Sequence, residues 1–195
     1  TTLKTKTEAG LGTVTVDGIT DDVIIEMKAG DNTVTIHNAT VPDELKMTGT
    51  TGADDFQISE VVAGKATVST SRGANAVYIS ASRIGRDLSV RGGRDGDRVE
   101  MVDLQVDGKA TIDTSSGGGI VGLQDVSVGT DLNVKSSSGG DVVGLKTVQV
   151  GRNLSIKTSS CDDRIGLADT HVQGAATIDG GSAGNAVRQD SVIVT

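Results

Sequence analysis

The chain has 195 residues, of which 27 are glycine and only 1% are aromatic, and its net charge at pH 7 is −8. The 18 basic residues form no run or stripe, and a chain with neither a basic stripe nor stacking aromatic side chains is not expected to bind nucleic acid. No apolar run approaches the roughly 18 residues of a membrane span, so we also expect no membrane insertion.

The composition predicts a narrow interior. The chain has one Phe, one Tyr and no Trp, whereas a wide, irregular core usually relies on aromatic side chains to fill its gaps. A core of Val, Leu, Ile and Ala suits the uniform interior of a repeat protein. The single cysteine, Cys161, excludes a disulfide framework, and the two scattered histidines, His37 and His171, do not complete a zinc site with it.

The first 22 residues are the least regular part of the chain. Their apolar residues follow the later pattern only with looser spacing. These are Leu3, Val14, Val16 and Ile19. We therefore expect residues 1–195 to form a single domain, with a less regular first coil in residues 1–22 and regular coils in residues 23–195.

From there on, the sequence repeats at a nearly constant interval. The first apolar residue of one segment recurs with one step of 21 residues and five steps of 22. This column is Leu45, Ala66, Leu88, Ala110, Leu132, Leu154 and Ala176. Self-similarity at a fixed period of this length is the signature of a solenoid.

Each repeat contains three short segments in which apolar residues alternate with other residues. The second segment begins at Phe56, Val77, Val99, Val121, Val143, Ile165 and Val187, and the third ends at Val62, Ile84, Val106, Val128, Val150, Val172 and Val194. Alternation with a period of two predicts strands with one buried face. The predicted fold is therefore all-β, a right-handed parallel β-helix of about nine coils of 20–22 residues with three short strands per coil, its hand taken from the general rule for parallel crossovers.

Charged residues that face outward give a second indication of the register. At one position the sign of the charge alternates from coil to coil, in the order Lys65, Asp87, Lys109, Asp131. Stacking in register places each of these residues beside an opposite charge, whereas a slip by one coil places like charges together. Because an exposed pair contributes less than about 1 kcal/mol, we interpret the pattern as specifying register more than strength.

A column of Asn and Asp precedes the second segment. Its members are Asn32, Asp54, Asn75, Asp97, Asp141, Asp163 and Asn185, with Gly119 as the exception. Such side chains cap turns by accepting hydrogen bonds from backbone N–H groups, and stacked Asn residues bond from coil to coil. We favour this inter-coil ladder and no cofactor, but stacked Asp residues repel one another, so calcium bound between coils is the alternative.

Two features favour contacts with other copies of the chain. Gly122, Gly144 and Gly166 occupy the same outward strand position in three successive coils, and glycine within a strand often marks a close approach by another backbone. The alternative explanation for this column is tight curvature at the following corner. At the chain ends, Val192 and Val194 belong to a last coil without a recognisable cap and Leu3 to the first, so we expect copies to associate laterally or end to end.

Runs such as "GADDFQIS", "GKATVSTSRGANAVYIS" and "GRDLSV" resemble the glycine- and Asx-rich β-strand repeats of large bacterial surface and adhesin-like proteins. This resemblance spans residues 20–195. It implies an exported, non-enzymatic module of an extracellular filament or a cell-surface assembly, or a stalk segment of a larger adhesin.

The alternative function is a β-helix that binds or cleaves a polysaccharide, as a lyase or a hydrolase. This alternative rests on fold analogy. Asp95, Asp97 and Arg98 are its candidate catalytic groups, but no repeat carries an insertion long enough to form the wall of a substrate groove. We therefore predict no catalytic residues, no metal ligands and no small-molecule substrate.

Overall fold

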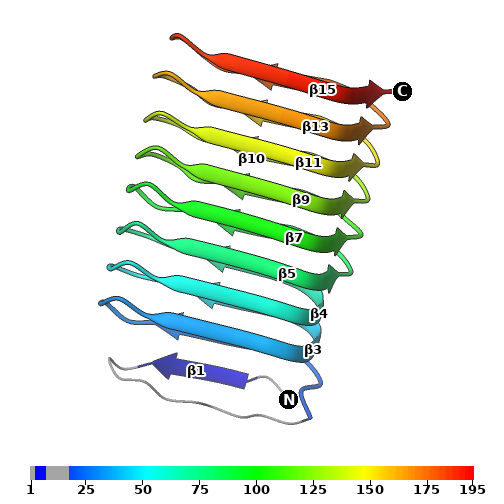
Figure 1. The fold of residues 1–195 in the computed structure, drawn as a ribbon. Coiled ribbons are helices and arrows are strands. Elements are labelled where there is room, and N and C mark those ends of the chain that lie inside the picture. The colour runs from blue at the N-terminus through cyan, green and yellow to red at the C-terminus, as the bar shows by residue number, and fades with distance from the viewer. Residues whose placement is uncertain (1–2, 8–17) are drawn as a thin grey trace.

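The computed structural model describes residues 3–7 and 18–195. They form a parallel β-solenoid of about eight turns, in which each strand lies directly above its counterpart in the preceding coil (Figure 1). The parallel β-helix expected from the sequence is thereby confirmed. The predicted strand positions Val14 and Val16, in the irregular first coil, lie outside the described residues.

Long and short strands alternate along most of the chain. The first four strands are β1 (Leu3–Thr7), β2 (Val23–Met27), β3 (Thr33–Thr48) and β4 (Asp55–Ser69). The nine-residue strands are β5 (Ala76–Ile84), β7 (Arg98–Val106), β9 (Ile120–Val128), β11 (Val142–Val150), β13 (Arg164–Val172) and β15 (Ala186–Val194). The four-residue strands are β6 (Leu88–Arg91), β8 (Ala110–Asp113), β10 (Leu132–Lys135), β12 (Leu154–Lys157) and β14 (Ala176–Asp179).

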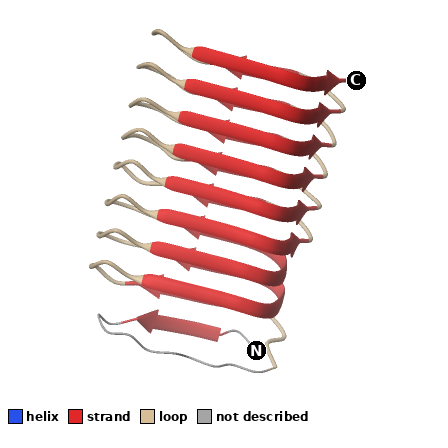
Figure 2. Ribbon diagram, in the orientation of Figure 1, coloured by secondary structure: helices blue, strands red, loops and turns tan. Residues whose placement is uncertain are grey.

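Two kinds of loop join these strands, and Figure 2 shows them at opposite ends of the coils. We call the segment from a short strand to the next long strand the turn, as in residues 136–141. We call the segment from a long strand to the next short strand the corner, as in residues 151–153. No helix occurs among residues 3–7 and 18–195, and so none there is long and apolar enough to cross a membrane.

Every strand pair is parallel, and the pairing follows the period of the sequence. Leu132 pairs with Leu154, and Val143 pairs with Ile165, each one repeat apart. One predicted position is wrong. Ala63 and not Val62 pairs with Ile84, because the residue missing from the 21-residue step lies at the corner that follows Ala63.

The second and third predicted segments of a coil are two halves of one continuous long strand. In β11, Val143 and Leu145 are buried before the bend, and Val148 and Val150 are buried after it. The bend is at Thr147, whose φ of 54° lies in the left-handed region. The same conformation recurs once per coil, at Asn38, Glu60, Ala81, Asp103, Asp125, Thr147, Asp169 and Ser191. One left-handed residue therefore lets two outward residues follow each other and turns both halves of the strand toward the core.

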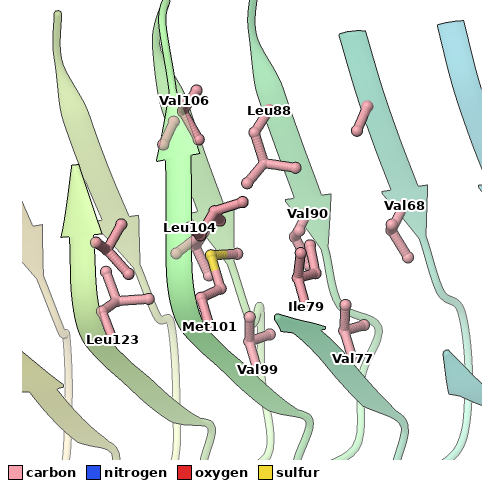
Figure 3. Packing of buried hydrophobic residues seen from close by; sticks show 14 of the residues in the cluster. Val68, Val77, Ile79, Leu88, Val90, Val99, Met101, Leu104, Val106 and Leu123 are labelled. Atoms are coloured by element: carbon pink, nitrogen blue, oxygen red, sulfur yellow. The ribbon is translucent and has the colours of Figure 1, made fainter. Parts of the chain in front are cut away.

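The core is a continuous stack of aliphatic side chains. Figure 3 shows Ile79, Leu88, Val90 and Met101 from neighbouring coils projecting into one interior. Phe56 is fully buried and supplies an aromatic ring near the N-terminal end. Each large aliphatic side chain buried in this way contributes about 1.5–3 kcal/mol, so the stack of coils supplies most of the stability.

The alternating charges of the corner are in register, but they are used differently from the prediction. Lys65 forms an ion pair with Glu44 of the preceding coil at 3.2 Å. Asp87 instead accepts a hydrogen bond from the backbone N–H of Lys109 at 2.9 Å. A carboxylate that caps the backbone of the next coil fixes the register more directly than an exposed ion pair does, because the N–H position is set by the chain itself.

Candidate functional site

A shallow groove of about 610 Å³ crosses the outer face of the long strands. Its floor contains Gly122 of β9, Gly144 of β11 and Gly166 of β13, which pair with one another in register. We call this feature the glycine groove. The column continues into Glu100 of β7 at one end and Arg188 of β15 at the other. The sequence placed the three glycines in one column, and the structure shows that the column is hollowed.

The glycines of the groove are not required by the fold around them. A Cβ atom on Gly144 or Gly166 would meet nothing within 4 Å, and one on Gly122 would lie 3.8 Å from the Glu100 side chain. None of the three has a positive φ. The curvature that the sequence offered as the alternative explanation belongs instead to Thr147 and its counterparts. Because glycine weakens a strand, its presence here calls for a cause outside the coil.

A row of larger side chains runs beside the glycines, two residues earlier in each strand. We call this row the ridge, and it consists of Arg98, Ile120, Val142 and Arg164. Ile120 and Val142 are 39% and 38% exposed. Sequence reasoning missed the ridge, although apolar residues at outward strand positions were a signal that could have revealed it.

Charge is distributed unevenly along the groove. Arg98 of the ridge donates a hydrogen bond to Glu100 within the same strand. Lys146 and Arg188, which line the middle and the far end, form no ion pair with any residue of the described part of the chain. The Arg98 and Glu100 charges therefore offset each other at one end of the groove. Towards the other end, Lys146 and Arg188 line the groove together with Asp190, without an ion pair among the described residues.

The predicted Asx column forms a ladder in the turns. In every member after Asn32, the carboxylate or amide oxygen accepts a hydrogen bond from the backbone N–H of its counterpart in the preceding coil, at 2.7–3.2 Å. The accepting residues are Asp54, Asn75, Asp97, Asp141, Asp163 and Asn185. The capping geometry that the sequence favoured is therefore present. Gly119 interrupts the ladder because a Cβ there would lie 2.2 Å from Oγ1 of Thr114, which fills the same space.

Asp97 shows the electrostatic cost of the ladder. Its side chain is buried, and burial raises the pKa of this carboxyl above the usual value of 3.8. Hydrogen bonds from Asn75 and from the N–H of Gly93 act in the opposite direction. Every carboxylate oxygen of Asp97 has a donor, so the charged form is tolerated although it is desolvated.

The last coil is more exposed than the others. In β15, Val187, Ile193 and Val194 are 49%, 56% and 51% exposed, and only Val192 packs partly against the core. Among the described strands, β15 pairs with β13 alone. Leu3 lies in β1, which pairs with β2, but its side chain is outside the described residues. Val192, Val194 and Leu3 remain the predicted end-to-end contacts.

The candidate catalytic groups are not gathered in one cleft. Asp97 is buried in the turn ladder, Arg98 lies on the outer ridge, and Asp95 accepts a hydrogen bond from the N–H of Gly73. Another acidic group was not predicted. Asp21, Asp22 and Asp43 offer oxygens within 4.8 Å of one another. Asp43 pairs with Arg86, and Asp22 accepts a hydrogen bond from the N–H of Glu44.

Comparisons of the chain with family models, with curated proteins and with solved structures found no match. The resemblance to adhesin-like surface repeats therefore stays a prediction.

Proposed function

We propose that this chain is a non-enzymatic structural module that associates side by side with a second copy of itself through the glycine groove. The observation that carries the proposal is the match in size between the ridge and the glycines. Ile120 lies beside Gly122, Val142 beside Gly144, and Arg164 beside Gly166. Where the glycine column ends in a large residue, Arg188, the ridge column ends in a small one, Ala186.

The size match defines one arrangement of two copies. A two-fold axis parallel to the solenoid axis exchanges the ridge of one copy with the groove of the other and keeps the order of the coils. Ile120 of each copy then fills the space above Gly122 of the other, and Val142 fills the space above Gly144. Because both copies have the same coil spacing, the fit repeats from coil to coil. Such an isologous contact is the commonest basis of a homodimer.

Charge supports the same arrangement. Exchange of the ridge and the groove brings Arg98 of each copy close to Glu100 of the other, in addition to its own Glu100. The guanidinium and carboxylate groups then form a four-member network. Networks of this kind fix register and orientation more than they add affinity. The apolar contribution comes from Ile120 and Val142, whose exposed surface is removed from water.

The test replaces groove glycines with valine. Gly144→Val combined with Gly166→Val adds side chains where a Cβ meets nothing within 4 Å, and valine favours strands. The variant is expected to fold at least as stably as the original chain but to weaken self-association by about tenfold or more. Sedimentation velocity over a concentration series measures association, and thermal unfolding measures the fold.

A matched control adds valine on the same strand outside the groove. Gln149 is an exposed outward residue of β11 beyond the bend, so Gln149→Val should leave association unchanged. The proposal is wrong if the unsubstituted chain is a monomer at every concentration, or if the groove variant associates as strongly as the original chain. End-to-end contacts through the last coil would appear as filaments in electron micrographs and would survive the groove substitutions.

We propose that this module is part of an extracellular or bacterial cell-surface assembly, because its repeats resemble those of adhesin-like surface proteins.

A specific observation favours a second candidate function, polysaccharide binding. Tyr78 lies at one end of the groove with 39% of its surface exposed, and an aromatic face can stack on a sugar ring. Titration of the chain with acidic oligosaccharides, with product analysis, tests this candidate. Saturable binding by a monomer would favour it over self-association.

A further inference from the structure

The turn ladder contains one step that differs from its neighbours. Asp141 and Asp163 are stacked in successive coils, and each is only 1% exposed. Oδ1 of Asp163 accepts the N–H of Asp141 at 2.8 Å, and Oδ1 of Asp141 accepts the N–H of Gly119 at 2.7 Å. The second oxygen of each carboxylate, Oδ2, has no hydrogen-bond partner among the described residues.

Unpartnered oxygens are concentrated at this step. Within the described part of the chain, five buried side-chain oxygens have no partner, and four of them belong to Asp141, Thr158, Ser159 and Asp163. Thr158 is 4% exposed. All four are oxygen atoms: the two carboxylate oxygens can only accept hydrogen bonds, whereas the two hydroxyls can donate or accept. A buried polar group without a partner costs about 1–3 kcal/mol, so this concentration calls for a ligand.

The ladder step from Asn75 to Asp97 shows how both oxygens of a carboxylate can be satisfied. Asn75 donates its amide N–H to Oδ1 of Asp97 at 2.9 Å, and the N–H of Gly93 donates to Oδ2 at 2.6 Å. The amide of Asn32 likewise donates to Oδ1 of Asp54 at 2.8 Å, but Oδ2 of Asp54 has no partner in the described part of the chain and is the fifth of the unpartnered oxygens. The step from Asp141 to Asp163 has an aspartate where these steps have an asparagine. It therefore gains a negative charge and loses an amide donor.

Thr158 lies in the same turn as Asp163. Thr158 stands five residues before Asp163, as Gly49 stands before Asp54 and Gly92 before Asp97. A Cβ on Gly49 or Gly92 would lie 2.3 Å from Oδ2 of the aspartate in its own turn. The N–H of Thr158 donates to the backbone carbonyl of Asp179 in the next coil, as the N–H of Gly92 donates to the backbone carbonyl of Asp113, so the backbone positions are equivalent. Because Thr158 carries such a Cβ, Oδ2 of Asp163 cannot lie where Oδ2 of Asp97 lies. In this turn, Oγ1 of Thr158 and Oδ2 of Asp163 are both buried without a hydrogen-bond partner among the described residues.

Two buried carboxylates in adjacent coils are stabilised by a positive partner close by. The nearby basic residue Arg164 begins β13 at an exposed, outward position, so it does not enter the turn. Oxygen-only ligand sets select hard cations, and two carboxylates balance a charge of +2. We propose that Asp141 and Asp163 bind one divalent cation of the calcium class between adjacent coils, with Thr158 Oγ1 and Ser159 Oγ as further ligands.

An ion would reach this site from the outer end of the turn. Ser159 is half-buried, and the next residues, Ser160, Cys161 and Asp162, are exposed. The cation would tie the two coils on either side of it, which include β11 and β13. The proposal is independent of self-association, because the turn and the glycine groove involve different residues.

The test measures calcium binding by chelator-treated, desalted protein. Calcium chloride should raise the melting temperature by roughly 5 °C at a concentration about 100-fold above the dissociation constant. Isothermal titration should give a binding component that depends on Asp141. Asp141→Asn recreates the arrangement of Asn75 above Asp97 and removes one charge. This variant should lose the calcium response and, without metal, melt at or above the temperature of the original chain.

Asp43→Asn is the matched control, because it removes a carboxylate from the exposed group formed with Asp21 and Asp22. It should keep the calcium response. The proposal is overturned if calcium leaves the melting temperature of the chelator-treated chain unchanged, or if Asp141→Asn still responds.

Discussion

The turns and the groove face each carry a column of glycines, and the two columns have different causes. The glycines of the turn column have φ values of 107–128°, which other residues rarely adopt. They are Gly30, Gly52, Gly73, Gly117 and Gly139. A Cβ on Gly52, Gly73 or Gly139 would lie 2.1–2.3 Å from the backbone of the preceding coil. Gly144 and Gly166 have neither constraint. Folding therefore accounts for the turn column, but it does not account for the groove column.

The largest expected effect comes from a substitution in the turn column. Gly139→Ala forces a Cβ to within 2.2 Å of the Gly118 backbone N at a φ of 107°. The free energy of unfolding should fall by about 3 kcal/mol, because the strained φ and the clash add together. The melting temperature should fall by roughly 10 °C. Urea denaturation and thermal unfolding both measure the loss.

The control for this prediction makes the same substitution in the groove column. Gly144→Ala meets no neighbouring atom and should raise the free energy of unfolding by about 0.5–1 kcal/mol, since alanine costs less conformational entropy than glycine. If both substitutions destabilise the chain equally, then the distinction between the two columns is false and the groove glycines are structural.

A smaller effect of opposite sign comes from Cys161, a residue of the turn column that is not glycine but has a positive φ. Cys161 follows Gly139 by one repeat and has a φ of 92°. Because a side chain is strained there, Cys161→Gly should raise the free energy of unfolding by about 1 kcal/mol. Urea denaturation checks this gain. Cys161→Ala keeps the Cβ and the strain, so it should show no gain; equal gains from both substitutions would mean that loss of the thiol, and not relief of the backbone, is responsible.

The repeat made the fold predictable from the sequence. A constant interval and two apolar residues per segment were enough to give the parallel stacking, the buried columns and the Asx ladder. The position of the bend could not be predicted, because its residues have no common chemistry. Thr147, Asp125 and Ala81 all adopt the left-handed conformation, and only the requirement that both halves of the strand face inward selects them. Val62 was misplaced because a corner can lose a residue without a change in composition.

Less of the candidate site was predictable. The glycine column was visible in the sequence, but whether a Cβ would fit there depends on backbone geometry that the repeat does not encode. The ridge was overlooked because Ile120 and Val142 sit next to the inward residues Val121 and Val143, so the run of apolar letters concealed which of them faces outward. The unpartnered oxygens at Asp141 and Asp163 depend on hydrogen-bond geometry in three dimensions.

Aspartate, like glycine, has different roles in two columns. Asp97 is buried in a turn, and burial raises its pKa above the ordinary value of 3.8. Asp131 lies at a corner, where hydrogen bonds from the side chain and the backbone N–H of Asn153 lower its pKa below 3.8. The two carboxylates should therefore change the stability of the fold in opposite directions as the pH changes.

The smallest expected effect is this difference in pH dependence. The contribution of Asp97 is fully present below its unfolded pKa and is lost as the pH rises through its raised folded pKa. The contribution of Asp131 is present above its unfolded pKa and is lost as the pH falls through its lowered folded pKa. Urea denaturation between about pH 3 and pH 7 measures the difference in free energy of unfolding between the original chain and each variant. The stability of the original chain relative to Asp97→Asn should decrease with rising pH, whereas its stability relative to Asp131→Asn should increase. If both stability differences changed in the same direction with pH, then the turn and the corner would shift the pKa of a carboxyl in the same direction. Burial in the turn would then not distinguish the two columns.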